Sequence, residues 1–233
     1  MRKNKIVLLC TVAVAVFAVA CQSKDKTKAD LIKKYEKMID LNDYQSACFY
    51  LQEYLFLDSN NIGYMDSLSR HYIALNNLLA AEAMAKKVVA KQPNNEDMQG
   101  VLATVAMQRG DVPTALGIYE KLYSNTKDYK YLYAQGITYV EGGANERGLA
   151  IAEELLAVPD ADIKTLEVNK LSSDGKQQIK LKAAALLIKG AVQLQTENPN
   201  TAKAYEYLKE CLAIQPDFEV AQNLVNQVFK GGK

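Results

Sequence analysis

Apolar residues recur at helical spacing along most of the chain, and residues 81–93 (AEAMAKKVVAKQP) show the pattern most clearly. Ala81, Ala85 and Val88 fall on one face of a helix, and Pro93 ends the helix because proline has no backbone N–H to donate. A small residue such as Ala81 lets a neighbouring helix approach closely. The pattern therefore predicts the second half of a helix-turn-helix unit. The same spacing recurs at Ala204, Leu208, Cys211 and Pro216.

Short polar or glycine-containing turns divide the chain at a constant interval. Asn42-Asp43, Asn76-Asn77 and Gly110-Asp111 are 34 residues apart, and one more step of that length reaches Ala144-Asn145. A fixed period of this size is typical of stacked helical repeats, in which each unit buries its apolar side against its neighbours. The pattern predicts four helix hairpins, each with a helix A before the turn and a helix B after it. Their ranges are 28–61, 62–95, 96–129 and 130–162.

A period of 34 residues with two helices per unit resembles the tetratricopeptide repeat family. Leu102-Ala103 with Ala106, and Gly136 with Tyr139, stand where that family has Leu-Gly and Tyr, whereas its tryptophan is absent from this chain. The resemblance implies an all-α solenoid, a right-handed superhelix of helix hairpins whose concave groove is lined by the A helices. The alternative is an amphipathic helical bundle, which explains the helices but not the constant period.

The helical pattern is interrupted over residues 163–182. Leu166 and Val168 alternate with polar residues, as do Ile179 and Leu181, and the turn cluster SSDG lies between the two stretches. A period of two on either side of Asp-Gly favours a β-hairpin insertion. The competing interpretation is a loop followed by early entry into the next helix.

Helical patterns resume after the interruption and continue to the C-terminus. Residues 183–216 form a fifth predicted hairpin with its turn at Asn198-Pro199-Asn200, and residues 217–233 form a predicted capping helix. The end of a solenoid needs a polar outer face because no further repeat covers it. Gln222, Asn223, Asn226 and Gln227 can supply that face, while Phe218, Ala221, Leu224, Val225 and Val228 are expected to point inward.

The first residues have the pattern of a secretory signal. Arg2, Lys3 and Lys5 precede an apolar run over residues 6–20, and small residues precede Cys21. The alternative is an uncleaved membrane anchor. As a helix, however, this run would rise about 22 Å, which is less than the roughly 30 Å of the hydrocarbon core. We therefore expect residues 1–20 to be a cleaved signal peptide.

The end of this segment resembles the bacterial lipoprotein signal, although Ala18 stands where leucine is usual. The resemblance implies that the Cys21 sulfur carries a diacylglycerol and that Cys21, N-acylated, becomes the new N-terminus. Several acyl chains are enough for stable anchoring. Gln22 is not the aspartate that retains such proteins at the inner membrane, so the resemblance implies an outer-membrane location facing the periplasm. Residues 21–29 are expected to be a lipidated tether.

Charge and composition argue against several classes of function. Lys+Arg 28 against Asp+Glu 27 gives a net charge of +1, and a nearly neutral domain has no electrostatic footprint for nucleic acid. His71 is the only histidine and the cysteines form no CxxC pair. We therefore expect no metal site, no cofactor and no enzymatic activity. Cys48 and Cys211 lie in the first and last repeats, too far apart for a disulfide, and are expected to be buried free thiols.

Matching helix-A positions across the units identifies side chains for the groove that the resemblance implies. Chaperone-binding members of the family hold a terminal carboxylate with lysine and asparagine, but Gly100 and Thr104 stand at such places here, which argues against that ligand. The expected groove residues are Asp66, Arg70, Thr104, Gln108, Tyr131, Thr138, Lys189 and Gln193.

The sequence favours a non-enzymatic scaffold, anchored by lipid in the cell envelope, that binds another envelope protein or a peptide segment in its groove. The alternative is a lipoprotein that binds small molecules or glycans for nutrient uptake. Larger helical-repeat lipoproteins of that kind carry long loop insertions with exposed tryptophans, and this chain has no tryptophan.

Overall fold

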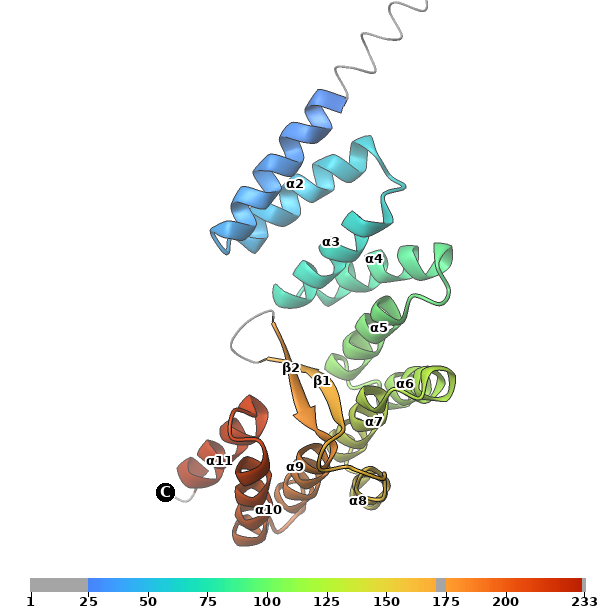
Figure 1. Ribbon diagram of the computed structural model, residues 1–233. Helices are drawn as coiled ribbons and strands as arrows, with labels where there is room; N and C mark the ends of the chain where they lie inside the picture. The colour runs from blue at the N-terminus through green and yellow to red at the C-terminus, as the bar shows by residue number, and fades with distance from the viewer. Residues whose placement is uncertain (1–24, 171–174, 232–233) are drawn as a thin grey trace, which may run out of the picture. The chain divides into compact units, whose positions relative to one another are not determined.

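The computed structural model describes residues 25–170 and 175–231 as a succession of helix hairpins with one small β-hairpin (Figure 1). The all-α prediction with a β-hairpin insertion is confirmed. The chain divides into two compact units, unit 1 up to Val101 and unit 2 from Leu102. The helices and strands are a helix over residues 25–40, α2 Tyr44–Leu57, α3 Ile62–Ala74, α4 Leu78–Lys91, α5 Glu96–Gln108, α6 Val112–Thr126, α7 Tyr129–Glu141, α8 Asn145–Leu156, β1 Thr165–Asn169, β2 Lys176–Lys180, α9 Leu181–Leu194, α10 Thr201–Ile214 and α11 Glu219–Gly231.

The N-terminal segment only partly falls within the described residues. The predicted signal peptide, residues 1–20, and the predicted lipidation site Cys21 lie outside them. Residues 25–29 were expected to belong to a tether, but they are helical. Lys28 explains the difference, because its ammonium group lies 3.1 Å from the Asp58 carboxylate and 6.0 Å from the centre of the Tyr54 ring. These contacts hold the start of the helix against the end of α2.

The turns between the A and B helices of the first four hairpins share one backbone conformation, which the α9–α10 turn does not have. In each of these turns one residue just after the A helix has a positive φ, between 55° and 78°. This left-handed conformation favours asparagine and glycine, which tolerate it. The next residue donates its backbone N–H to a carbonyl five positions back, at 2.8–2.9 Å, as in a Schellman motif. The left-handed residues are Asn42, Asn76, Gly110 and Gly143.

The fourth turn arrives one residue earlier than the constant period predicts. Gly143 takes the left-handed conformation and Ala144 becomes the residue that precedes the helix, so α8 begins at Asn145. In the three earlier turns the residue at this place is Asp43, Asn77 or Asp111, whose side chain accepts a hydrogen bond from the helix start. Ala144 cannot make that bond.

Unit 1 is held together by small and apolar side chains on α2, α3 and α4. The small openers predicted for the B helices, Ala47 and Ala81, have no exposed surface. Ser69 is also buried, and its hydroxyl donates to the Ala81 carbonyl oxygen at 2.8 Å, which ties α3 to α4. Leu51, Leu68, Ala85 and Val88 complete the interior.

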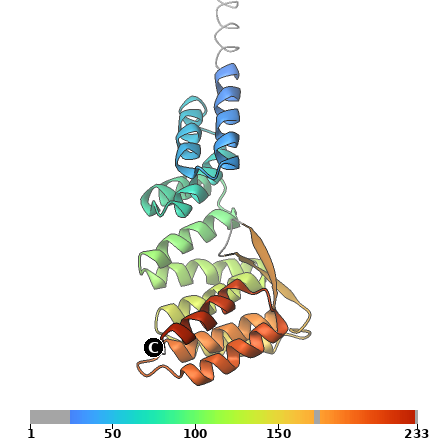
Figure 2. The same cartoon turned by 90° about the vertical axis from the view of Figure 1, so that its left-hand side faces the viewer.

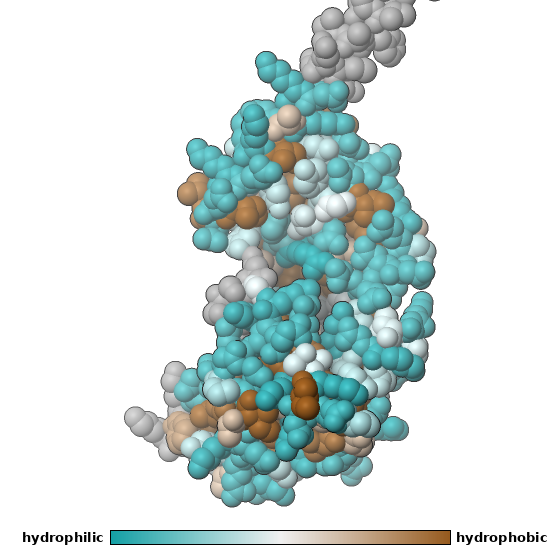
Figure 3. Space-filling model, in the orientation of Figure 1, coloured by the Kyte–Doolittle hydropathy of each residue, from teal (hydrophilic) through white to brown (hydrophobic). Residues whose placement is uncertain are grey.

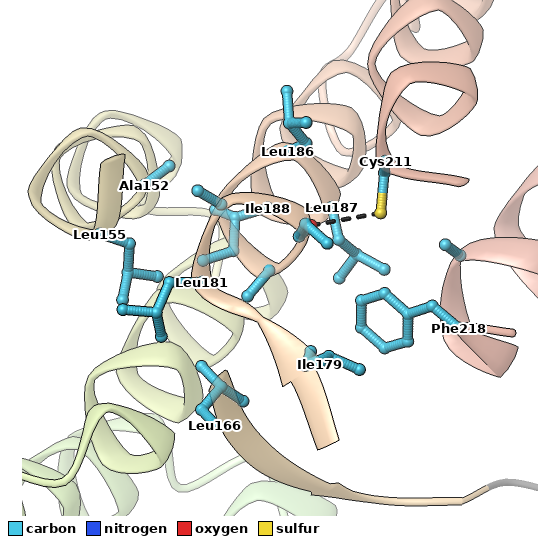
Figure 4. Close-up of a cluster of buried hydrophobic side chains, with 14 of the residues drawn as sticks. Ala152, Leu155, Leu166, Ile179, Leu181, Leu186, Leu187, Ile188, Cys211 and Phe218 are labelled. Carbon is cyan, nitrogen blue, oxygen red and sulfur yellow. Dashed lines mark hydrogen bonds between the residues drawn. The ribbon is translucent and has the colours of Figure 1, made fainter. Parts of the chain in front are cut away.

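Unit 2 has one continuous buried cluster that joins α7–α11 and the β-hairpin. Figure 4 shows Phe218 and Ile179 directed toward Leu187, with Leu166 on the neighbouring strand. The Cys211 thiol donates to the Ala183 carbonyl oxygen at 3.2 Å, so α10 packs closely on α9. In Figure 2 the hairpin runs along one side of these C-terminal helices.

The β-hairpin has the predicted alternation. Leu166 pairs with Ile179 across the antiparallel strands, and both are buried. Gln177 points to the same side, where its amide donates to the Asp217 carbonyl oxygen at 2.6 Å, so this buried polar group is satisfied. Leu181 was expected to extend the second strand, but it is the first residue of α9, which therefore follows β2 without a linker.

Candidate functional site

The predicted groove residues of unit 1, Asp66 and Arg70, lie together on α3. The Arg70 Nε atom is 2.6 Å from the Asp66 carboxylate, and its Nη2 atom is 3.1 Å from the Asp97 carboxylate at the start of α5. Two acids therefore neutralise this one cation. Arg70 links two helices and is not a free charge for a ligand.

The predicted residues of unit 2 differ in how much surface they offer. Tyr131 is 5% exposed and Thr138 is 3% exposed, so neither presents a side chain to a ligand. Both lie on the face of α7 that packs inward, which differs from the expected groove position. Thr104 is half-buried and bonded to the Tyr119 hydroxyl, whereas Gln108 is exposed.

The last two predicted residues, Lys189 and Gln193, lie one turn apart on α9. The Lys189 ammonium group is 2.9 Å from the Glu153 carboxylate and 5.3 Å from the centre of the Tyr207 ring. Gln193 is half-buried, and its backbone carbonyl accepts from the Asn200 N–H at 2.9 Å. Lys189 thus connects α8, α9 and α10.

An open apolar groove lies in unit 1, between α2 and α4 with α3 as its floor. Its main part has a volume of about 680 Å³. Figure 3 shows apolar surface patches set among hydrophilic surface over these helices. The lining residues are Gln52, Leu55, Phe56, Ser59, Met65, Leu68, Tyr72, Met84, Lys87, Ala90 and Lys91, and we call this surface the α2–α4 groove.

A second hollow of about 400 Å³ adjoins the α2–α4 groove. Gln52 and Tyr72 line both hollows, and the Gln52 amide donates to the Tyr72 hydroxyl between them. Phe49 and Leu75 line the second hollow and are 54% and 41% exposed. The two hollows therefore follow α2 over most of its length.

Sequence reasoning did not identify this groove. Phe56, at 88% exposure, is the most exposed of the large apolar side chains in the described residues. A signal was present, because Phe49 and Phe56 are seven residues apart and share one face of a helix. Nothing in the sequence says, however, that this face lies open rather than covered by another helix.

The described residues offer little for catalysis. Over residues 25–170 and 175–231 no cluster of histidine, cysteine and acidic residues could hold a metal ion, and no helix has the length and apolar character to cross a bilayer. Burial raises the pKa of the Cys48 thiol to about 11 and that of Cys211 to about 12, so neither is a ready nucleophile. The Tyr35 hydroxyl and His71 Nε2 lie 3.1 Å apart, and the two rings pack against each other, so this pair has a packing role.

Comparisons with known proteins identify the architecture. No protein-family model matches the chain, and no curated protein sequence is significantly similar to it. Among solved structures, a tetratricopeptide repeat protein from Parabacteroides merdae matches with a TM-score of 0.61 and 14% identity, over 88% of this chain and 73% of that one. TTC0263 from Thermus thermophilus, a thermophilic TPR protein, matches with a TM-score of 0.56 and 14% identity over 87% and 97%. The chain has the tetratricopeptide-repeat fold.

A third similar structure is YrrB, described as a TPR protein with an unusual peptide-binding site. It matches with a TM-score of 0.54 and 18% identity, over 90% of this chain and 97% of that one. In TPR terms, α2 and α4 are the B helices of the first two repeats and α3 is the A helix between them. The α2–α4 groove therefore differs from the predicted groove, which was expected on the A helices.

Proposed function

We propose that the protein is a non-enzymatic scaffold, anchored by lipid in the cell envelope, that binds a protein or peptide segment of another envelope component. The observation that carries the proposal is the α2–α4 groove, an open apolar hollow bordered by the almost fully exposed ring of Phe56. Apolar surface that lies open on a folded domain is typical of interaction sites. The TPR fold supports the same conclusion, because stacked helix hairpins present extended binding surfaces.

The lipid anchor rests on the sequence before the first repeat. A basic start, an apolar run and the small residues before Cys21 have the order of a bacterial lipoprotein signal. Gln22 favours the outer membrane, with the TPR repeats facing the periplasm. A module held at a membrane meets its partner without having to diffuse to that surface.

The binding function is tested by crosslinking in membranes, followed by purification of the protein with its partner. The wild-type chain is expected to retain a stoichiometric partner, and Phe56→Ser is expected to lose it because the aromatic wall of the groove is gone. Phe229→Ser is the matched control, since Phe229 is also exposed, at 61%, but lies on α11. Saturable sugar binding by calorimetry, with no protein partner, would instead support the nutrient-uptake alternative.

The anchor is tested separately by Cys21→Ala. Without the sulfur no diacylglycerol can be attached, so the protein is expected to move from the membrane fraction to the soluble fraction. Cys10→Ala, within the same signal segment, is the control and is expected to change nothing. A Cys21→Ala protein that stays in the membrane fraction would contradict lipidation at this residue.

A further inference from the structure

The two hollows beside α2 form one track whose length suits a helix. The α2 residues that line them lie along one side of the helix, from Gln45 to Phe56. At 1.5 Å per residue this stripe is about 17 Å long. A partner helix of about 14 residues would cover it.

The apolar anchors of this track have helical spacing themselves. Phe49 borders the smaller hollow and Phe56 the larger one, and both rings are more than half exposed. Seven residues separate them, which is about 10 Å along the helix axis. A docked amphipathic helix offers side chains at the same interval, so apolar residues at i, i+3 or i+4, and i+7 can meet both rings and the Met65 and Leu68 floor between α2 and α4.

The charged side chains that line the α2–α4 groove are all positive. Lys87 and Lys91 are its only charged lining residues, and they lie one turn apart on α4. The Lys91 ammonium group bonds to the neutral Asn60 amide oxygen at 2.7 Å. Neither lysine has a carboxylate partner among the described residues, in contrast to Lys86, which pairs with Glu82 at 2.7 Å.

We propose that the α2–α4 groove binds an amphipathic helix of a partner protein, with apolar anchors against Phe49 and Phe56 and acidic side chains beside Lys87 and Lys91. This inference rests on the proposed binding function and gives the chemistry of the partner. The lysines supply orientation and selectivity for acidic flanks, and the exposed rings of Phe49 and Phe56 supply most of the apolar area that binding would bury. The B helices form the walls of the groove, and none of the groove residues predicted from the sequence lines it.

The test is selection from a display library of helical peptides of about 14 residues. Each member has apolar residues at i, i+4 and i+7, while the flanking positions vary between Glu, Gln and Lys. The full chain is expected to enrich Glu-flanked members, and Phe56→Ser is expected to abolish enrichment. The double variant Lys87→Glu with Lys91→Glu is expected to bind the selected peptides about tenfold more weakly by fluorescence anisotropy and to enrich Lys-flanked members instead. Lys86→Glu with Glu82→Lys, on the same helix, is the control and is expected to leave the preference unchanged.

The possible outcomes separate this inference from the proposed function. Enrichment with no preference for Glu at the flanking positions would overturn the inference. Peptide binding that persists in Phe56→Ser would overturn it as well. Self-association of the full chain that depends on Phe56 would also contradict it. If crosslinking still recovers a stoichiometric partner in that case, the scaffold function stands and only the partner chemistry is wrong. A circular dichroism spectrum matching the wild type ensures that each variant is folded.

Discussion

At the residue scale, the turns explain how this chain adopts a regular fold. Asn42, Asn76, Gly110 and Gly143 end their helices in the left-handed region, where other side chains are strained. In the first three of these turns the side chain of the following residue caps the next helix. A pair of residues thus ends one helix and starts another, and repeating the pair at a fixed interval repeats the hairpin.

The missing cap at Ala144 predicts that adding a capping side chain there stabilises the protein and that removing one from another turn destabilises it. Ala144 has φ −86° and ψ 59°, close to the −85° and 68° of Asp111, which does cap its helix. Ala144→Asp is therefore expected to raise the free energy of unfolding by about 1 kcal/mol, and Asp111→Ala to lower it by about as much. Urea denaturation followed by circular dichroism measures both changes.

The direction of each change in the free energy of unfolding decides whether this prediction holds. Both substitutions are in unit 2, so they act on the same cooperative core. If Ala144→Asp proved neutral while Asp111→Ala was costly, the backbone amides at the start of α8 would already be satisfied in another way.

At the element scale, the β-hairpin shows what the sequence does and does not predict. Alternation at Leu166 and Ile179 around a turn predicts two strands, and the structure confirms both. The strands end earlier than expected because Leu181 has its side chain buried in the helical core. Periodicity identifies a strand or a helix, but one apolar residue at their junction fits either, and only packing decides.

The junction between the hairpin and α11 gives a second prediction. Phe218 has no exposed surface and packs against the hairpin and α9 in the continuous cluster of unit 2. Phe218→Ala is expected to lower the free energy of unfolding by about 3–5 kcal/mol. Phe229→Ala removes the same atoms from an exposed side chain beside Tyr205 and is expected to cost far less. Thermal denaturation compares the two, and equal losses would mean that α11 contributes no specific packing.

At the scale of the whole molecule, the two units differ in how they use apolar side chains. Unit 2 has a buried cluster that spans five helices and the hairpin, with Ile163 and Phe229 more than half exposed outside it. Unit 1 leaves Phe49, Phe56 and Leu79 more than half exposed. Because stability in repeat proteins is a sum of local terms, we expect unit 1 to unfold at a lower denaturant concentration.

The buried thiols report on each unit separately. Cys48 lies in unit 1 and Cys211 in unit 2, and burial protects both at neutral pH because the thiolate is the reactive form. Alkylation in increasing urea, with peptide-level mass spectrometry to distinguish the cysteines, is expected to modify Cys48 first. Simultaneous modification of the two thiols would show that the chain unfolds as one cooperative body.

The functional surface was harder to predict than the fold. The repeat period fixes which helix faces pack together, so buried residues such as Ala81 and Val88 follow from the sequence. The ligand surface depends on which faces stay uncovered, and this is a property of the assembled repeats. Tyr131 was expected in the groove yet is buried, while Phe56 received no role and is the most exposed aromatic ring among the described residues.

The direct passage from β2 into α9 has a mechanical consequence. Because no residue lies between Lys180 and Leu181, a displacement of β2 acts directly on the first turn of α9. That turn contains Ala183, whose carbonyl oxygen accepts the hydrogen bond from the Cys211 thiol of α10. A partner that bound the two strands would therefore act on the interior of unit 2 without contacting it.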